Sequence, residues 1–226
     1  MTMERSYLVI DLEMCKVPKP RRCKEYHYSH EIIQIGAVLL DEDYTEISTF
    51  STFVKPEYGV MDWEISSLTG ITDHDVKRSP YLAEAMQMFL GWLNGRDVTV
   101  FAWSDSDYAQ FQHEIHAKRI FSMEITSFLR ESRWCDYQKV FGDRYKINRS
   151  VGLAEALNLT SINPEGRLHD GLFDAINTGR LIAKLEKDPE FKLPEMFEQA
   201  RKERETKPLG FSLGDLFSEL NLELSA

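Results

Sequence analysis

The sequence of 226 residues has no hydrophobic run close to the roughly 18 residues that a membrane-spanning helix needs. Its first residues, MTMERSYLVI, lead into an apolar run without a small-residue cleavage site, unlike a secretory signal. Only three cysteines are present, Cys15, Cys23 and Cys135, and none forms a CxxC pair, which argues against a disulfide framework and a cysteine zinc site. We therefore expect a cytoplasmic protein with reduced thiols and no membrane partner.

Positive charge is also scarce, with 27 lysines and arginines against 37 aspartates and glutamates and a net charge of −10. This balance argues against a protein that holds nucleic acid by covering phosphates with basic faces. It leaves metal-dependent chemistry on phosphates open, because bound divalent cations supply local positive charge where carboxylates gather. The sequence also lacks a Walker loop, a G-x-G-x-x-G fingerprint, a G-x-S-x-G elbow and the zinc deaminase pattern, which argues against those enzyme classes.

The hydrophobic spacing predicts an α/β fold with a mixed sheet flanked by helices. Residues 7–12 form an apolar run typical of a buried strand, and two β-rich segments after it are separated by the turn-forming residues 41–43. We therefore expect the first three strands to form an antiparallel meander. The strands are predicted at 7–12, 31–40, 46–55 and 98–103, and the helices at 80–94, 105–119, 151–157 and 171–185.

Domain organisation follows from where this pattern stops. Residues 1–185 are expected to form one domain, followed by a charged extension at 186–226. Apolar residues at helical spacing predict a helix over 213–224, although Gly214 interrupts the pattern. The extension is compatible with a homodimer contact, a contact with another protein or a lid.

Paired carboxylates close the first strand. Acid-x-acid pairs recur by chance in so acidic a chain, and most are solvated surface pairs. Asp11 and Glu13 differ because they end a buried strand, where the two-residue period puts both side chains on one face. Burying two carboxylates without a partner costs several kcal/mol each, so this position predicts a metal platform.

Three further residues are candidates for the same site. Asp107 follows the strand at 98–103 and starts a predicted helix, where it could cap the helix or face a cleft, and Asp105 fits this position equally well. Asp174 lies on the helix at 171–185, five residues after His169, which taken alone would be an ordinary surface histidine. Two other histidines, His113 and His116, lack a third metal ligand nearby and fit an exposed helix face.

Three segments taken together are far more specific than their members. The segments VIDLEMC (9–15), WSDSDYAQF (103–111) and HDGLFDA (169–175) resemble, in order and spacing, the three motifs of the DEDDh exonucleases of the DnaQ-like superfamily. Three others, at 30–40, 53–57 and 66–76, are similar to the KapD and Eri-type branch, whose members include RNA 3′-end trimmers. The resemblance covers about residues 6–185.

The resemblance implies a ribonuclease H-like fold and a metal-dependent 3′ to 5′ exonuclease that hydrolyses the 3′-terminal phosphodiester of single-stranded RNA or DNA, with RNA favoured. It assigns two Mg²⁺ ions, for which Mn²⁺ could substitute, to Asp11, Glu13, Asp107 and Asp174. Asp107 is preferred over Asp105 because the motif places its aspartate four residues before an apolar residue, here Phe111.

His169 would be the general base of this reaction. This role needs a neutral imidazole, so activity should fall below about pH 6.5, where histidines in general become protonated. Two alternatives remain at this point. One is a regulatory or nucleic-acid-binding protein that uses the fold without turnover, and the other is an RNase H-like endonuclease.

Substrate contacts are predicted beside the carboxylates. A basic cluster follows the first strand and could guide phosphates to the site, although Pro18 and Pro20 also fit a solvated surface connection. Met14 and Trp103 are candidates for contacts with bases, with core packing as the alternative for Trp103. The members of the basic cluster are Lys16, Lys19, Arg21, Arg22 and Lys24.

Overall fold

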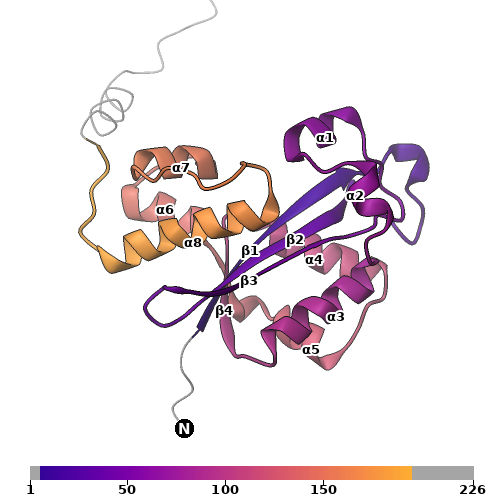
Figure 1. Cartoon of the computed structure of the whole chain (residues 1–226), viewed down its shortest axis with the longest axis horizontal. Helices are drawn as coiled ribbons and strands as arrows, with labels where there is room; N and C mark the ends of the chain where they lie inside the picture. The colour runs from indigo at the N-terminus through magenta and orange to yellow at the C-terminus, as the bar shows by residue number, and fades with distance from the viewer. Residues whose placement is uncertain (1–5, 195–226) are drawn as a thin grey trace, which may run out of the picture. The chain divides into compact units, whose positions relative to one another are not determined.

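The computed structural model describes residues 6–194, whose centre is a five-stranded mixed sheet in the order β3-β2-β1-β4-β5 (Figure 1). Strands β1, β2 and β3 form an antiparallel meander, whereas β4 and β5 run parallel to β1. The predicted meander is therefore confirmed. The strands are β1 (Ser6–Lys16), β2 (His30–Leu40), β3 (Glu46–Phe53), β4 (Val98–Ala102) and β5 (Trp134–Asp136).

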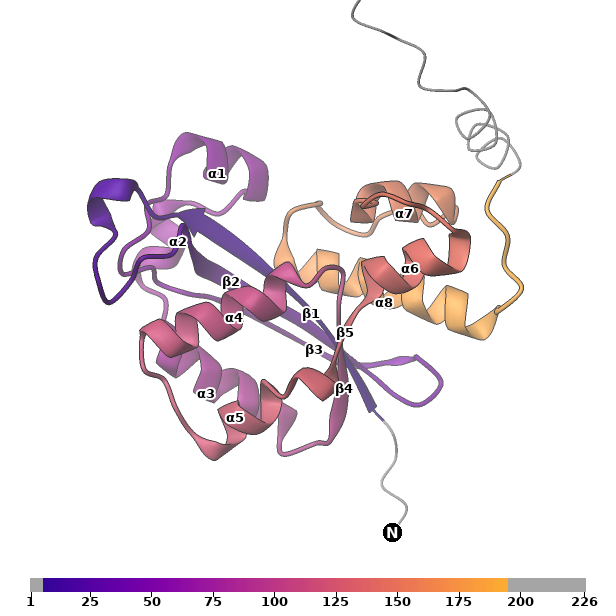
Figure 2. The ribbon, with the colours of Figure 1, turned by 180° about the vertical axis from the view of Figure 1, so that it is seen from behind.

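Helices cover both faces of this sheet. Helix α8 (Gly171–Lys187) contacts β1, β2 and β3 on the face turned forward in Figure 1, and α3, α4 and α5 cover the face seen in Figure 2. This two-sided cover explains why β1 and β2 are buried along most of their length. The other helices are α1 (Trp63–Thr69), α2 (Asp73–Lys77), α3 (Leu82–Leu93), α4 (Ser106–Ala117), α5 (Met123–Phe128), α6 (Tyr137–Tyr145) and α7 (Leu153–Leu159).

Alternation along β1 decides which side chains face which layer. Leu8, Ile10 and Leu12 are buried in the hydrophobic core formed with α3, α4 and α5. Val9 belongs to the opposite face, where Gly179 of α8 lies against it. Asp11 and Glu13 follow Val9 in the same two-residue period, so β1 presents its carboxylates on the face that α8 covers.

Close backbone approach sets the position of α8 at the site. A Cβ atom at Gly36 of β2 would lie 2.0 Å from the carbonyl carbon of Gly171, the first residue of α8. Gly36 is also the register partner of Asp11. The absence of a side chain at position 36 therefore lets the first turn of α8 rest directly on the sheet beside Asp11.

Several short elements were not predicted, among them α1, α2, α5, α6 and β5. Each has nine residues or fewer, too few to show a hydrophobic period clearly. Helix α8 ends at Lys187, so the predicted domain boundary at 185 falls in its last turn, and the compact unit extends to Phe191. The helix predicted over 213–224 lies outside the described residues.

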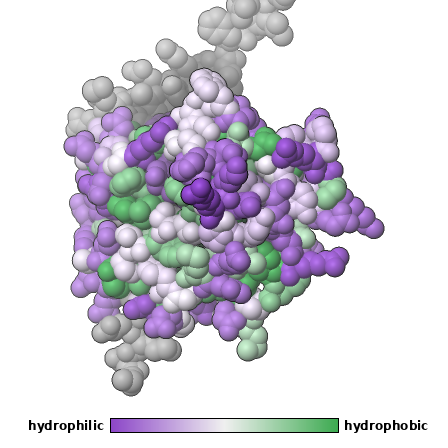
Figure 3. Space-filling model, turned by 45° about the vertical axis from the view of Figure 1, so that its right-hand side comes forward, coloured by the Kyte–Doolittle hydropathy of each residue, from purple (hydrophilic) through white to green (hydrophobic). Residues whose placement is uncertain are grey.

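The last features of the fold are its surface, its cysteines and the length of its helices. Hydrophilic side chains are interspersed with small hydrophobic areas on the face shown in Figure 3. All three cysteines are free, with Cys15 buried in the interior. Among the described residues, every helix is too short or too polar to cross a membrane.

Candidate active site

The carboxylates of β1 lie at the carboxyl-terminal half of the strand. Glu13 is buried, with 8% of its surface exposed, and Asp11 is partly buried. The pairing of β1 with β2 shifts between Glu13 and Met14, so a bulge follows the second carboxylate. Bulges re-aim side chains and are common beside functional sites.

Asp107 reaches the same place from the neighbouring strand. Strand β4 pairs in parallel with β1, and α4 begins four residues after it, so the first turn of α4 lies near the middle of β1. The Oδ1 atom of Asp107 accepts a hydrogen bond from the backbone N–H of Leu12 at 3.0 Å. Asp107 is thereby held against the segment of β1 that carries Asp11 and Glu13, and only 4% of its surface is exposed.

Asp105, the competing candidate, lies in a different environment. It precedes α4, its side chain is 71% exposed, and it pairs with Lys139 at 3.2 Å on the surface. It caps no backbone N–H of α4. The geometry therefore separates the two aspartates that spacing could not separate, and it favours Asp107 as the site residue.

His169 and Asp174 lie at the start of α8. The backbone N–H of His169 donates to Asp174 Oδ2 at 2.9 Å, and His169 adopts a left-handed conformation with φ of 63°. Asp174 is buried in the first turn of α8, whereas His169 is exposed in the loop before it. The five-residue spacing thus reflects a loop that folds back onto the first turn of the helix.

Two residues that support this loop, Asp170 and Gln34, were not predicted from the sequence. Asp170 caps α8, and its Oδ1 accepts from the backbone N–H groups of Leu172 and Phe173. Gln34 of β2 accepts from the N–H of Gly171 at 3.0 Å and donates to Asp170 Oδ1 at 3.3 Å. An aspartate just before a helix is a readable cap signal, but Gln34, far away in the sequence, gives none.

Three of the predicted residues come together as possible ligands. Glu13, His169 and Asp174 each offer an atom, and these atoms all lie within 4.8 Å of one another. Within the described part of the chain, the second carboxylate oxygen of Asp174, Oδ1, is buried without a hydrogen-bond partner. Because a buried carboxylate oxygen needs a partner, and oxygen ligands suit Mg²⁺, this group fits a divalent cation.

The electrostatics of the four carboxylates point the same way. Burial raises the pKa of Asp11 well above its usual range, and the charges of Asp107, Asp174 and Glu13 raise it further. Burial, followed by the charge of Asp174, raises the pKa of Glu13 to about 8, and burial raises that of Asp107 to about 7. The carboxylates therefore repel one another when ionised, and nearby positive charge would relieve this repulsion.

Without divalent cations, the free energy of unfolding is expected to fall as the pH rises from about 4.5 to about 8. Glu13 in the unfolded chain ionises near its ordinary value of 4.5, whereas folded Glu13 keeps its proton up to about pH 8. The stabilisation that this proton gives the folded state is therefore lost across this window. Urea unfolding in EDTA at several pH values measures the effect.

The variant Glu13→Gln serves as the comparison for this experiment. Its unfolding free energy in EDTA should depend less on pH than that of the unaltered protein, because glutamine does not ionise. Added Mg²⁺ should reduce the dependence in the unaltered protein, because the cation stabilises the ionised carboxylates. Identical pH dependence in the two proteins would contradict the electrostatic account.

The predicted substrate residues lie in and after the end of β1. Lys16 pairs with Glu64 of α1, and Arg21 and Arg22 donate to the carbonyls of Gly59 and Val17, respectively. Lys19 and Lys24 are exposed in the same segment. The two arginines thus hold the loop in shape, while the two lysines face solvent.

Met14 and Trp103 have different surroundings. Met14 is partly buried and packs against the core cluster on the α3, α4 and α5 side. Trp103 is buried, and its indole N–H donates to Val151 O at 3.0 Å. The structure therefore gives Trp103 a packing role, and contact of either residue with a base stays a prediction.

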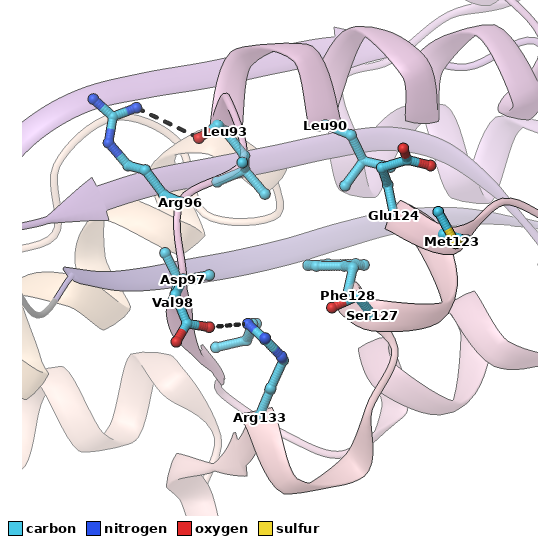
Figure 4. A pocket seen from close by; sticks show the side chains of 12 residues that line it. Leu90, Leu93, Arg96, Asp97, Val98, Met123, Glu124, Ser127, Phe128 and Arg133 are labelled. Atoms are coloured by element: carbon cyan, nitrogen blue, oxygen red, sulfur yellow. Dashed lines mark hydrogen bonds and ion pairs between the residues drawn. The ribbon is translucent and has the colours of Figure 1, made fainter. Parts of the chain in front are cut away.

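A hollow elsewhere on the surface contains none of the predicted site residues (Figure 4). It lies between α3, α5 and the start of β4, at the end of β4 opposite to α4. Its walls include Leu90, Met123 and Phe128, with the ion pair of Asp97 and Arg133 at one side. The hollow is therefore separate from the carboxylate site.

Comparison with known proteins identifies the family of this chain. A model of the exonuclease family (RNase_T) matches residues 8–182. The 3′-5′ exoribonuclease 1 of Homo sapiens is 27% identical over 191 residues, which cover 77% of this chain and 52% of the relative. The 3′-5′ exonuclease Snipper of Drosophila melanogaster is 26% identical over 178 residues, covering 70% and 62%. The chain spans about half the length of the exoribonuclease 1 relatives that it matches.

Solved structures show the same fold. The nuclease domain of 3′hExo, described as a DEDDh family member bound to rAMP, has a TM-score of 0.68 at 22% identity, over 85% of this chain and 98% of that one. A full-length 3′-exonuclease has a TM-score of 0.71 at 23% identity, over 85% and 64%. The predicted ribonuclease H-like fold and the resemblance to the Eri-type DEDDh branch are confirmed. Because the family match spans most of the sheet and of α8 and includes every carboxylate of the site, this chain belongs to the exonuclease family.

Proposed function

We propose that this protein is a 3′ to 5′ exonuclease that removes nucleotides from the 3′ end of single-stranded nucleic acid, with RNA preferred over DNA. The observation that carries the proposal is the convergence of Glu13, His169 and Asp174, with Asp11 and Asp107 beside them, in a member of the exonuclease family. The preference for RNA is supported by relatives named 3′-5′ exoribonuclease and by a similar nuclease domain bound to rAMP.

Two divalent cations, Mg²⁺ or Mn²⁺, are proposed to bind between the four carboxylates. Asp11, on which the charges of the other three carboxylates all act, would help to hold the ions together with Glu13 and Asp174. Asp107 would contribute directly or through water. Such cations supply Lewis-acid chemistry, polarising the phosphate and making the attacking water more acidic.

His169 is proposed as the general base. Its side chain is exposed, and one ring nitrogen lies within the group of atoms formed with Glu13 and Asp174. In the neutral form, this nitrogen can accept a proton from water as the water attacks the terminal phosphodiester. The hydrogen bond from the backbone of His169 to Asp174 couples the base to the carboxylates.

The basic cluster after β1 is proposed to guide the strand to the site. Lys19 and Lys24 are the members to test, since Arg21 and Arg22 also bind loop carbonyls. The double variant Lys19→Gln, Lys24→Gln should bind single-stranded RNA more weakly, with an unchanged chemical step. The slope of log affinity against log salt should become less negative by about 1.4, from roughly 0.7 per phosphate contact. Fluorescence anisotropy in Ca²⁺ at several salt concentrations measures the affinity and its salt slope.

The control variant for this cluster carries the same change of charge elsewhere. Arg130 lies before β5 and Lys187 ends α8, both away from the carboxyl end of β1. The variant Arg130→Gln, Lys187→Gln should keep the original salt slope. Equal slopes in the two double variants would reject the guiding role of the cluster.

A time course with end-labelled strands tests the proposed function itself. RNA and DNA strands labelled at the 3′ or 5′ end are incubated with Mg²⁺, Mn²⁺ or EDTA. We expect immediate release of the 3′ label as mononucleotide, a stepwise ladder from the 5′-labelled strand, faster degradation of RNA and no reaction in EDTA. Cleavage of a circular strand would indicate an endonuclease, and binding without products would indicate a regulatory protein.

Two further proposals, a partner contact and a cellular location, rest on the sequence alone. A contact with a second copy or with another protein is assigned to residues 186–226, and its test is the oligomeric state of the chain with and without that segment. A cytoplasmic location is proposed on the same sequence grounds.

A further inference from the structure

The loop between α7 and α8 carries His169 and is fastened to α8 by several hydrogen bonds, including one set at Glu165 and one at the histidine itself. The side-chain amide of Asn177 accepts from the N–H of Glu165 at 2.8 Å and donates to its carbonyl at 3.0 Å. The N–H of His169 donates to Asp174. Both fastenings tie the loop to the helix that follows it, whereas the hydrogen bond from Gln34 to Asp170 ties the end of the loop to β2.

Arg167 makes another connection, which leads away from α8. Its Nη2 atom donates to the carbonyl of Ser67 at 2.6 Å and to that of Leu68 at 3.1 Å, about a hundred residues earlier in the chain. Both carbonyls belong to the last turn of α1, where carbonyls have no partner within the helix. Helix α1 contacts β1, so the guanidinium links the histidine loop to the element that flanks the carboxylate strand.

Gly70 shows that the chain is shaped around this guanidinium. It ends α1 with φ of 79°, a conformation that side chains rarely adopt. A Cβ atom at position 70 would also lie 2.2 Å from Nη1 of Arg167. The end of α1 thus offers Arg167 both free carbonyls and the space to reach them.

His169 needs such an external support. It is exposed and holds a left-handed backbone conformation, which costs about 1 kcal/mol or more for a residue other than glycine. A general base must be placed accurately, because a displacement of about 1 Å can reduce the rate about a hundredfold. Only Leu168 separates Arg167 from His169, so the guanidinium is anchored directly beside the base in the chain.

We propose that Arg167 is a positioning residue that holds the histidine loop against the end of α1 and so keeps His169 over the carboxylates. The proposal rests on the proposed nuclease function for its kinetic consequence. The link itself, between the two segments 67–70 and 166–170, is a property of the protein without substrate.

Kinetics of Arg167→Ala test the positioning role. We expect kcat on single-stranded RNA to fall about 10- to 100-fold, with KM within about twofold and an unchanged salt dependence. Arg167→Lys should not restore kcat, because the lysine side chain ends one atom short of the Nη2 atom that donates to both carbonyls. Added guanidinium ion should restore part of the activity of Arg167→Ala.

Two further variants separate positioning from general damage. Arg149→Ala removes an exposed arginine that pairs with Glu155 away from the site, and it should leave kcat unchanged. Gly70→Ala should lower kcat as well, since its Cβ displaces the guanidinium. The double variant with Arg167→Ala should then lose no more than the worse single variant.

Hydrogen exchange without substrate tests the link independently of nuclease activity. In Arg167→Ala, the backbone amides of residues 67–70 and 166–170 should exchange at least about tenfold faster, with the rest of the chain unchanged. A raised KM with a smaller salt slope and unchanged kcat would show that Arg167 binds a substrate phosphate and would overturn the proposal. Unchanged exchange in both segments would also overturn it. An unaltered protein without nuclease activity would reject the proposed function, while the exchange result would still decide the link.

Discussion

The variant Asp107→Asn is expected to lower kcat at least about a thousandfold while leaving the protein folded. Asparagine keeps the oxygen that accepts the N–H of Leu12, so the connection between α4 and β1 can persist. It removes the charge that the proposed metal site needs, and a metal ion contributes several kcal/mol to the transition state, where 1.36 kcal/mol corresponds to a factor of ten. Single-turnover rates on 3′-labelled RNA at saturating Mg²⁺ measure the loss.

The same substitution at Asp105 is a matched control, because the two aspartates are two residues apart at the start of α4. Asp105 is exposed and pairs with Lys139, so Asp105→Asn should change kcat by less than about twofold. Equal losses in the two variants would mean that both aspartates serve the site. Normal activity in Asp107→Asn would remove Asp107 from the proposed metal ligands.

The variant Lys118→Met is expected to destabilise the protein by about 3–5 kcal/mol, since it breaks a buried ion pair on one side only. The Nζ atom of Lys118 lies 2.6 Å from Glu31 and 2.9 Å from Glu114, and both glutamate side chains are fully buried. Removal of the lysine would leave two carboxylates in the interior without a cation. For a chain of this size, we expect a fall in melting temperature of about 6–20 °C, measured by thermal unfolding at pH 7.

This loss should depend on pH and on the partner removed. Burial already raises the pKa of Glu114 to about 7 with Lys118 present, so at lower pH a protonated Glu114 would reduce the cost of removing the lysine. Adding Glu114→Gln to Lys118→Met should likewise recover part of the stability. Glu57, the third partner of Lys118, is 40% exposed, and Glu57→Gln should cost less than about 1 kcal/mol. A loss in Lys118→Met no larger than that in Glu57→Gln would contradict the buried network.

The parts of the site that could be predicted are those that depend on the spacing of residues within a single segment. The two-residue period of β1 separates Leu8, Ile10 and Leu12 from the carboxylates, and the structure places the two sets on opposite faces as expected. The amphipathic helices that became α3 and α8 were found in the same way. In each case, one segment of the sequence contains the whole signal.

The parts that could not be predicted depend on residues far apart in the chain. Glu31 and Lys118 are 87 positions apart, and each looks like a solvated surface charge until the fold brings them together. The distinction between Asp105 and Asp107 depends on a hydrogen bond with Leu12, 95 positions away. Arg167 contacts α1 about a hundred residues earlier in the chain. Helix α1 itself is too short to show in the hydrophobic pattern, so the sequence gives no sign of this contact.

The close approach of Gly36 and Gly171 has an electrostatic consequence. Aligned peptide dipoles give the first turn of a helix a partial positive charge, equivalent to about half a proton charge. Helix α8 has 17 residues, and its first residue rests on the sheet beside Asp11 because position 36 has no side chain. The positive end of the helix therefore lies beside Asp11, on which the charges of three other carboxylates act, so the fold itself supplies a fixed part of the charge balance before any cation binds.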